Sequence, residues 1–206
     1  MKKSIVFDFG GVIFETSRRA MYAERFATQG RPEADVDYFL QNIFNKAANS
    51  EANRGTVKEV TDRLALQHPN WADDIRAFNA DRDFIHNVRG LVPGMKETLQ
   101  ALKAEGHKLY ALTNWPSDAF QTLAKAYPDV VGLFNDIVVS GDVKMGKPDP
   151  RIFAFAHSLY EHPDPANTLF FDDKPANIEA AIKTVGWQGH VFKDAATVRN
   201  LVAGLG

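Results

Sequence analysis

The chain has 206 residues, of which 45% are hydrophobic and 24% are charged, and 15 of the hydrophobic residues are Phe. This length allows either one compact body or one core that carries an insertion, and the composition excludes disordered and collagen-like chains. The 24 Lys and Arg nearly balance the 26 Asp and Glu, which leaves a net charge of −2. Nucleic acid and anionic membranes favour a basic excess, so we expect neither as a partner, whereas a small anionic molecule needs only a few local cations.

Cysteine is absent from the sequence, which excludes disulfides, thiolate metal sites and cysteine nucleophiles. Lys2 and Lys3 precede an apolar run that is similar to the start of a signal peptide, but Asp8 soon interrupts this run. No apolar stretch approaches the roughly 20 residues that span a bilayer. We therefore expect a soluble cytoplasmic protein, while the sequence leaves its oligomeric state open.

The first strand is expected over residues 4–7, and a region of helical pattern follows it. Five apolar residues in this region have the spacing of one amphipathic helix face: Phe39, Leu40, Ile43, Phe44 and Ala47. Thr56 and Glu59 form a capping box ahead of a further helix. We predict an all-helical insertion over residues 16–90, which leaves residues 1–15 and 91–206 for the core.

The rest of the chain alternates short apolar runs with segments of helical spacing. Strands are expected at residues 108–113, 136–140, 168–171 and 190–192. Helical faces are formed by Met95, Leu99 and Leu102, by Phe120, Leu123 and Tyr127, and by Ile178, Ala181, Ile182 and Val185. Repeated strand–helix–strand units predict a Rossmann-like α/β fold, in which helices cover both faces of a parallel sheet.

Four of the five predicted strands are followed by residues with reactive or charged side chains. They are, in chain order, Asp8, then Thr113 with Asn114, then Lys147 in the segment 146–150, and finally Asp172 with Asp173. Because ligands bind outside the carboxyl ends of parallel strands, we expect these side chains to converge at one edge of the sheet.

In this order, the four motifs resemble those of the haloacid dehalogenase superfamily of hydrolases. The resemblance covers the whole chain and includes a helical cap of the C1 type after the first strand. The first motif, which runs from Asp8 to Val12 with glycine at position 10, is most similar to that of the α-glucose-1-phosphate phosphatase subgroup.

The resemblance implies that Asp8 is a nucleophile, which attacks phosphorus and forms an aspartyl-phosphate that water later hydrolyses. Mg²⁺ would be held by Asp8, by the backbone carbonyl of Gly10 and by Asp173. Asp172 would be a further ligand or a hydrogen-bond acceptor beside the ligands. Lys147 would offset negative charge between the nucleophile and the phosphate.

The resemblance also implies residues that bind the substrate, a small phosphorylated metabolite. The Thr113 hydroxyl and the neighbouring Asn114 would hold the transferring phosphate. The tight turn at Gly10 and Gly11 would let the backbone approach the phosphate closely. Arg54, just before a cap helix, would clamp an anionic or hydroxylated group, although it could equally be an ordinary exposed arginine.

Gly10 departs from the usual pattern of the family. Phosphatases of this superfamily usually carry there an aspartate that acts as general acid and base, a role worth about 10²–10⁴-fold in rate. Three interpretations follow: a phosphatase whose leaving group needs little protonation, a 2-haloacid dehalogenase with Asp8 as nucleophile, or a catalytically silent regulatory protein that binds a metal or ligand. The acidic pair Asp172–Asp173 argues against a dehalogenase, because those enzymes usually lack it and need no metal. We expect a Mg²⁺-dependent phosphatase that acts on a small sugar phosphate.

Overall fold

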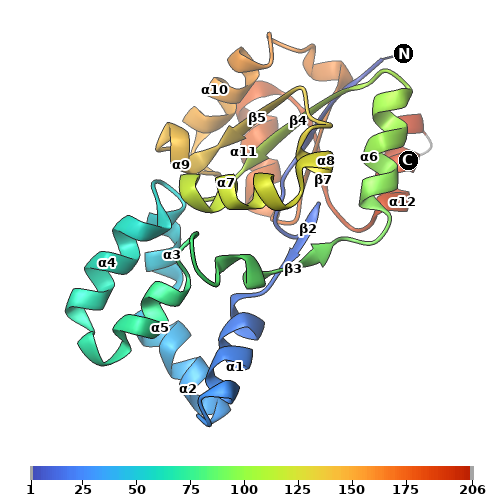
Figure 1. The fold of residues 1–206 in the computed structure, drawn as a ribbon. Helices are drawn as coiled ribbons and strands as arrows, with labels where there is room; N and C mark the ends of the chain where they lie inside the picture. Colours follow the sequence, from blue (N-terminus) through green and yellow to red (C-terminus); the bar gives the residue numbers. More distant parts are fainter. Residues whose placement is uncertain (1, 205–206) are drawn as a thin grey trace.

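The centre of the molecule is a five-stranded parallel sheet, seen in a computed structural model that describes residues 2–204 (Figure 1). The strands are β1 (Ser4–Phe7), β4 (Lys108–Thr113), β5 (Asp136–Val139), β6 (Thr168–Asp172) and β7 (Gln188–Val191). They lie in the order β5–β4–β1–β6–β7. The five strands predicted from the sequence are confirmed, although β7 begins two residues before the expected range 190–192 and ends at Val191.

Both faces of this sheet are buried, which explains the continuous apolar runs in its strands. Ile5 and Phe7 belong to one hydrophobic cluster, whereas Val6 belongs to a second cluster on the opposite face. The first cluster includes residues of α6 (Met95–Ala104), α7 (Ser117–Ala126) and α12 (Ala195–Ala203), and the second includes residues of α10 (Pro150–Leu159) and α11 (Pro175–Val185). Shorter elements are α8 (Pro128–Val131), α9 (Ser140–Val143) and a 3₁₀ turn at Pro165–Asn167. The predicted α/β fold with a doubly covered parallel sheet is therefore confirmed.

A helical insertion, defined here as residues 17–87, lies beyond one end of the sheet (Figure 1). Its helices are α1 (Arg18–Thr28), α2 (Glu33–Tyr38), a π-helical turn (Phe39–Ile43), α3 (Lys46–Ala52), α4 (Val57–Gln67) and α5 (Ala72–Ala77), with 3₁₀ turns at Pro69–Trp71 and Phe84–Asn87. The predicted capping box begins α4: the Glu59 N–H donates to Thr56 Oγ1 at 3.2 Å, and the Thr56 N–H donates to Glu59 Oε2 at 3.0 Å. Within residues 2–204, no helix combines the length and apolar character needed to cross a membrane.

The segment 16–90 is not entirely helical, so this part of the sequence-based prediction is wrong. β2 (Phe14–Thr16) pairs antiparallel with β3 (Val88–Leu91) and forms a two-stranded ribbon between the insertion and the core. Such short strands, one of them containing Gly90, hold too few residues for an alternating pattern. Their pairing partners are also distant in the sequence, which local patterns cannot reveal.

The predicted apolar face from Phe39 to Ala47 is also interrupted. The π-helical turn ends at Ile43, and the Asn45 side chain then accepts hydrogen bonds from the N–H groups of Ala47 (3.0 Å) and Ala48 (3.1 Å), which begins α3. Phe39 and Ile43 are buried, whereas Ala47 is exposed. Asparagine side chains compete for backbone hydrogen bonds and favour helix starts, so this local signal outweighs the apolar spacing.

Candidate active site

Asp8 directly follows β1 at the carboxyl edge of the sheet. Its N–H donates to Phe171 O at 2.9 Å, and the residue is only 4% exposed. Its Oδ1 accepts a hydrogen bond from Phe9 N (2.7 Å) and forms an ion pair with Lys147 Nζ (3.1 Å). Its Oδ2 has no hydrogen-bond partner within the described part of the chain, so this oxygen is available to a ligand.

Lys147 is buried where three acceptors meet. Its Nζ contacts Asp8 Oδ1 and donates to Asp172 Oδ2 and to Leu112 O, the latter two at 2.6 Å. Asn114 holds the backbone of Lys147 from both sides, because its Oδ1 accepts from Lys147 N and its Nδ2 donates to Lys147 O, each at 2.8 Å. The amide of Asn114 thus positions Lys147, and the substrate contact expected for Asn114 stays a prediction.

The acidic pair after β6 divides into two environments. Asp172 is fully buried, and its oxygens accept hydrogen bonds from Lys147 Nζ (2.6 Å), Lys174 N (2.9 Å) and Asn177 Nδ2 (2.8 Å). The side chain of Asp173 is 39% exposed, and Lys174 Nζ lies 3.8 Å from its Oδ1. Asp172 is therefore engaged in holding Lys147, while Asp173 keeps its oxygens accessible.

Burial and neighbouring charges together set the protonation of this cluster. Burial raises the pKa of Asp8, and the Lys147 ammonium offsets this only in part. Burial alone would lower the pKa of Lys147, but the carboxylates of Asp8 and Asp172 outweigh it and raise that pKa. Burial also opposes ionisation of Asp172, yet Lys147 and the hydrogen bonds from Lys174 and Asn177 lower its pKa overall. Lys147 and Asp172 therefore form a charged pair beside Asp8.

Three carboxylates at this edge fit the predicted metal site. Asp8, Asp172 and Asp173 each place an oxygen within 4.8 Å of the other two. Such hard oxygen donors suit Mg²⁺, which binds to one or two carboxylates and keeps several waters. Because both oxygens of Asp172 already accept hydrogen bonds, Asp8 and Asp173 are better placed to bind a cation directly. Burial raises the pKa of Asp173, and a nearby cation would favour its charged form.

The turn after Asp8 and the end of β4 complete the edge of the site. Gly11 has φ +78°, a conformation that favours glycine, and a Cβ there would lie 3.2 Å from Asp173 Oδ2, so any other residue would also displace that carboxylate. Thr113 is fully buried, and its hydroxyl has no hydrogen-bond partner within residues 2–204. An unsatisfied buried polar group costs about 1–3 kcal/mol, which a ligand oxygen at this hydroxyl would recover.

A cavity of about 400 Å³ opens above Asp8. Asp8, Gly10, Gly11, Asn114 and Asp173, which the sequence singles out, all line it. Sequence reasoning missed further lining residues: Arg18, Asn49, Asn53 and Asn87 from the insertion, and Lys174 from the core. Trp115, which the sequence suggests as a core residue or a lining residue, is buried and also lines the cavity. The i, i+4 spacing of Asn49, which lies in α3, and Asn53, which directly follows α3, was the available signal for this polar wall.

Arg54 lies outside this cavity. Its exposed side chain lines a smaller adjoining hollow of about 170 Å³, together with Lys46, Asn114 and Lys147. The substrate contact expected for Arg54 therefore concerns the neighbouring hollow, and it stays a prediction.

Comparison with known proteins identifies the family. Residues 2–183 match the family model of the haloacid dehalogenase-like hydrolases. The chain belongs to this family and is a hydrolase, as the order of its motifs predicts.

Named relatives and solved structures agree with this assignment. The sesquiterpene phosphatase astK of Aspergillus oryzae is 28% identical, over 97% of this chain and 94% of its own. The validoxylamine A 7′-phosphate phosphatase of Streptomyces hygroscopicus subsp. limoneus is 25% identical, over 88% of this chain and 81% of its own. A HAD family enzyme of Bacteroides thetaiotaomicron, in complex with magnesium and inorganic phosphate, has a TM-score of 0.67 at 22% identity, covering 94% of this chain and 96% of that chain. This likeness confirms the HAD-like fold.

Proposed function

We propose that this chain is a Mg²⁺-dependent phosphomonoester hydrolase that forms an aspartyl-phosphate on Asp8. The observation that carries the proposal is the meeting of Asp8 with the buried ammonium of Lys147 and the accessible carboxylate of Asp173. The phosphatase names of the two curated relatives support the same reaction class. We also propose that residues 16–90 act as a cap over a core formed by residues 1–15 and 91–206.

The contacts of Asp8 support its role as the nucleophile in this reaction. Its Oδ1 is held by Phe9 N and Lys147 Nζ, which leaves Oδ2 to attack phosphorus while the bond to the ester oxygen breaks. Water then attacks the aspartyl-phosphate, releases inorganic phosphate and regenerates the carboxylate. The Lys147 ammonium offsets negative charge, and the Thr113 hydroxyl donates a hydrogen bond to a transferring oxygen.

The metal would be held by Asp8, Asp173 and the backbone carbonyl of Gly10. When bound, Mg²⁺ supplies positive charge that reduces the repulsion between a carboxylate and a phosphate dianion. Asp172 acts differently in this proposal, because its hydrogen bonds position Lys147 and leave it little capacity to bind the cation. The magnesium and phosphate complex of the Bacteroides enzyme supports this choice of ion.

We infer that the substrate is a small sugar phosphate. Gly10 cannot protonate a leaving group, which favours esters whose departing oxygen is weakly basic, such as sugar 1-phosphates. The amides of Asn49, Asn53 and Asn87 line the cavity, and amides both donate and accept hydrogen bonds, as sugar hydroxyls require. The similarity of the first motif to α-glucose-1-phosphate phosphatases supports the same substrate class.

One set of assays tests this function. Phosphate release from a panel of phosphomonoesters is measured with Mg²⁺ and with a chelator, for the wild-type protein and for Asp8→Asn, beside halide release from 2-haloacids. We expect phosphate release that requires both Mg²⁺ and Asp8. Metal-independent halide release would instead establish a dehalogenase. Mg²⁺ binding without turnover of either class would establish a non-catalytic protein.

A further inference from the structure

We propose that Arg18 binds a second anionic group of the substrate, so that preferred substrates carry a carboxylate or a second phosphate besides the phosphoryl group that Asp8 attacks. This inference rests on the proposed phosphatase function and narrows its substrate class. The residues of the core select the phosphate, and the helical insertion selects the remainder of the molecule.

The guanidinium of Arg18 is held in the wall of the cavity. Arg18 is the first residue of α1 and lines the same cavity as Asp8. Its Nη1 donates to Phe44 O at 3.2 Å, and its Cζ lies 5.2 Å from the centre of the Phe44 ring. The other guanidinium nitrogens donate to no protein acceptor among residues 2–204, so they are available to a ligand.

Among the described residues, 2–204, no carboxylate forms an ion pair with Arg18. Other arginines form ion pairs, as Arg25 does with Asp74, whereas Arg18 and Arg54 form none within the part of the chain that the structure describes. Arg54 is exposed to water, but Arg18 is half-buried, and burial lowers its pKa. Removing a cation from water without a counter-ion costs free energy, which an anionic ligand would recover.

The start of a helix is also an unfavourable place for this cation. Helix N-termini carry a partial positive charge and favour acidic side chains, yet the first turn of α1 holds no acidic residue. The adjacent Arg19 forms outward ion pairs with Glu33 (3.0 Å) and Asp37 (3.1 Å). Arg18 gains no such compensation from residues 2–204, so helix stability does not explain its position.

The chemistry of the cavity wall defines the class of substrate. A guanidinium donates two parallel N–H groups, which match the paired oxygens of a carboxylate or phosphate. Asn49 and Asn53 add groups that suit hydroxyls. A phosphorylated sugar acid or a sugar bisphosphate satisfies both requirements.

Matched esters test this inference through kcat and KM. α-D-Glucose 1-phosphate is compared with α-D-glucuronic acid 1-phosphate and with α-D-glucose 1,6-bisphosphate, and glycerol 3-phosphate is compared with 3-phosphoglycerate. We expect the wild-type enzyme to favour the esters with a second anion. Arg18→Gln should reduce that preference by about 10- to 100-fold, mainly through KM, because a hydrogen bond to a charged group is lost. Arg18→Lys should keep part of the preference, and Arg19→Gln, the matched control on the outer face, should keep all of it.

Two other results would overturn this inference and leave the proposed phosphatase activity intact. The first is a wild-type enzyme that hydrolyses p-nitrophenyl phosphate but shows no preference for esters with a second anion. Loss of the preference in Arg54→Gln but not in Arg18→Gln would place the anion in the neighbouring hollow. If no ester is hydrolysed at all, the phosphatase proposal fails. The role of Arg18 is then tested separately by calorimetry with Mg²⁺, which compares the binding of 3-phosphoglycerate and glycerol 3-phosphate to the wild-type and Arg18→Gln proteins. Equal affinities for the two ligands in the wild type would overturn the inference.

Discussion

Gly10 and Gly11 stand side by side in the turn after Asp8, but different constraints act on them. Position 11 favours glycine because of its positive φ, and a Cβ there would also make a tight contact with the Asp173 side chain. At Gly10, a Cβ would lie 3.5 Å from Trp115 Nε1 and 3.8 Å from Thr16 Oγ1, which are ordinary van der Waals contacts. Space near the backbone therefore does not exclude a side chain at position 10.

Gly10→Asp should place a general acid at position 10, where glycine cannot transfer a proton. We expect kcat for an alkyl ester such as glycerol 3-phosphate to rise by about tenfold or more, since general acid catalysis contributes about 10²–10⁴-fold. Turnover of p-nitrophenyl phosphate should change little, because its leaving group departs without a proton. Gly10→Asn is the control, as it adds a similar volume but no transferable proton. An equal gain in the Asn variant, or no gain in the Asp variant, would show that proton transfer does not limit the reaction.

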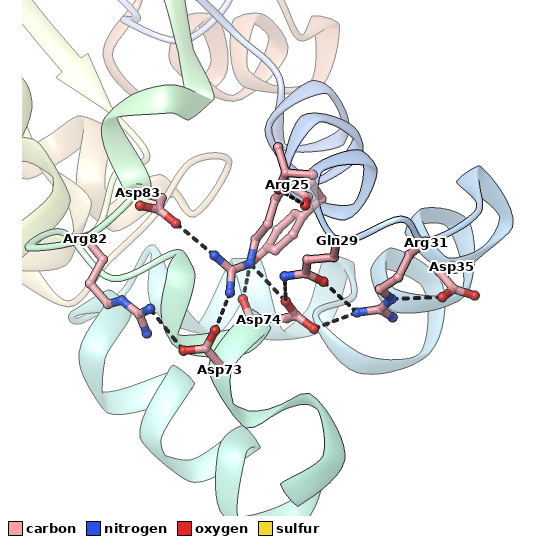
Figure 2. A network of polar contacts seen from close by, with 10 residues as sticks. Arg25, Gln29, Arg31, Asp35, Asp73, Asp74, Arg82 and Asp83 are labelled. Carbon is pink, nitrogen blue, oxygen red and sulfur yellow. Dashed lines mark hydrogen bonds and ion pairs between the residues drawn. The ribbon is translucent and has the colours of Figure 1, made fainter.

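Among the elements, α1 is joined to α5 by a network of charged side chains (Figure 2). Arg25 Nε donates to Asp74 Oδ1 at 2.9 Å, and Arg31 Nη1 donates to Asp74 Oδ2 at 2.7 Å. The side chain of Asp74 is only 9% exposed. The Cζ atom of Arg31 also lies 3.9 Å from the centre of the Phe26 ring. Because α1 begins at Arg18, this network also contributes to the position of the proposed anion-binding group.

Asp74→Asn should destabilise the insertion. Removal of one partner from a buried ion pair lowers the free energy of unfolding by about 3–5 kcal/mol. Because both arginines are partly exposed, we expect a smaller loss of about 2 kcal/mol. Urea unfolding of the wild-type and variant proteins measures this loss. Asp73→Asn is the matched control, because Asp73 belongs to the same network but its side chain is 72% exposed. We expect the free energy of unfolding of this control to fall by less than about 1 kcal/mol. Equal losses in the two variants would contradict the role of burial.

At the scale of the whole molecule, backbone groups of the insertion bind directly to the core. Asp118 on α7 accepts hydrogen bonds from the N–H groups of Val57 (2.8 Å) and Lys58 (3.2 Å), the first two residues of α4. Ser117 N also donates to Gly55 O at 2.9 Å. A carboxylate satisfies N–H groups that a helix start leaves unpaired, so a core residue caps a helix of the insertion. These contacts hold the insertion against the core beside the cavity.

Asp118→Ala should weaken the attachment of the insertion. Loss of a helix cap costs about 0.5–2 kcal/mol. We therefore expect the state in which the insertion contacts the core to become less populated, and KM to rise by up to about tenfold. Hydrogen exchange at the amides of Val57 and Lys58 should accelerate in parallel. Asp129→Ala, which removes a surface ion pair with Lys96, is the control and should alter neither quantity. Unchanged exchange and KM in Asp118→Ala would show that other contacts hold the insertion.

Sequence patterns could predict the parts of the site that depend on short segments. Asp8, Thr113 and Asp172 each end or follow a buried strand, and parallel strands place their carboxyl ends at one edge. The same reasoning predicted the five strands and the capping box at Thr56. It failed at the β2–β3 ribbon, whose strands are short and pair across more than seventy positions of the chain, and at Asn45, where a polar cap interrupts an apolar face.

The sequence by itself determined the family, the sheet and the chemistry of the strand ends, because each depends on local periodicity and on the order of motifs. Tertiary structure decided how the two acidic residues after β6 differ, since Asp172 meets Lys147 and Asn177 while Asp173 faces the cavity. It also brought Arg18 from the start of α1 to the cavity that contains Asp8. The cause is physical: hydrogen bonding, burial and charge compensation depend on distances between residues that lie far apart in the chain.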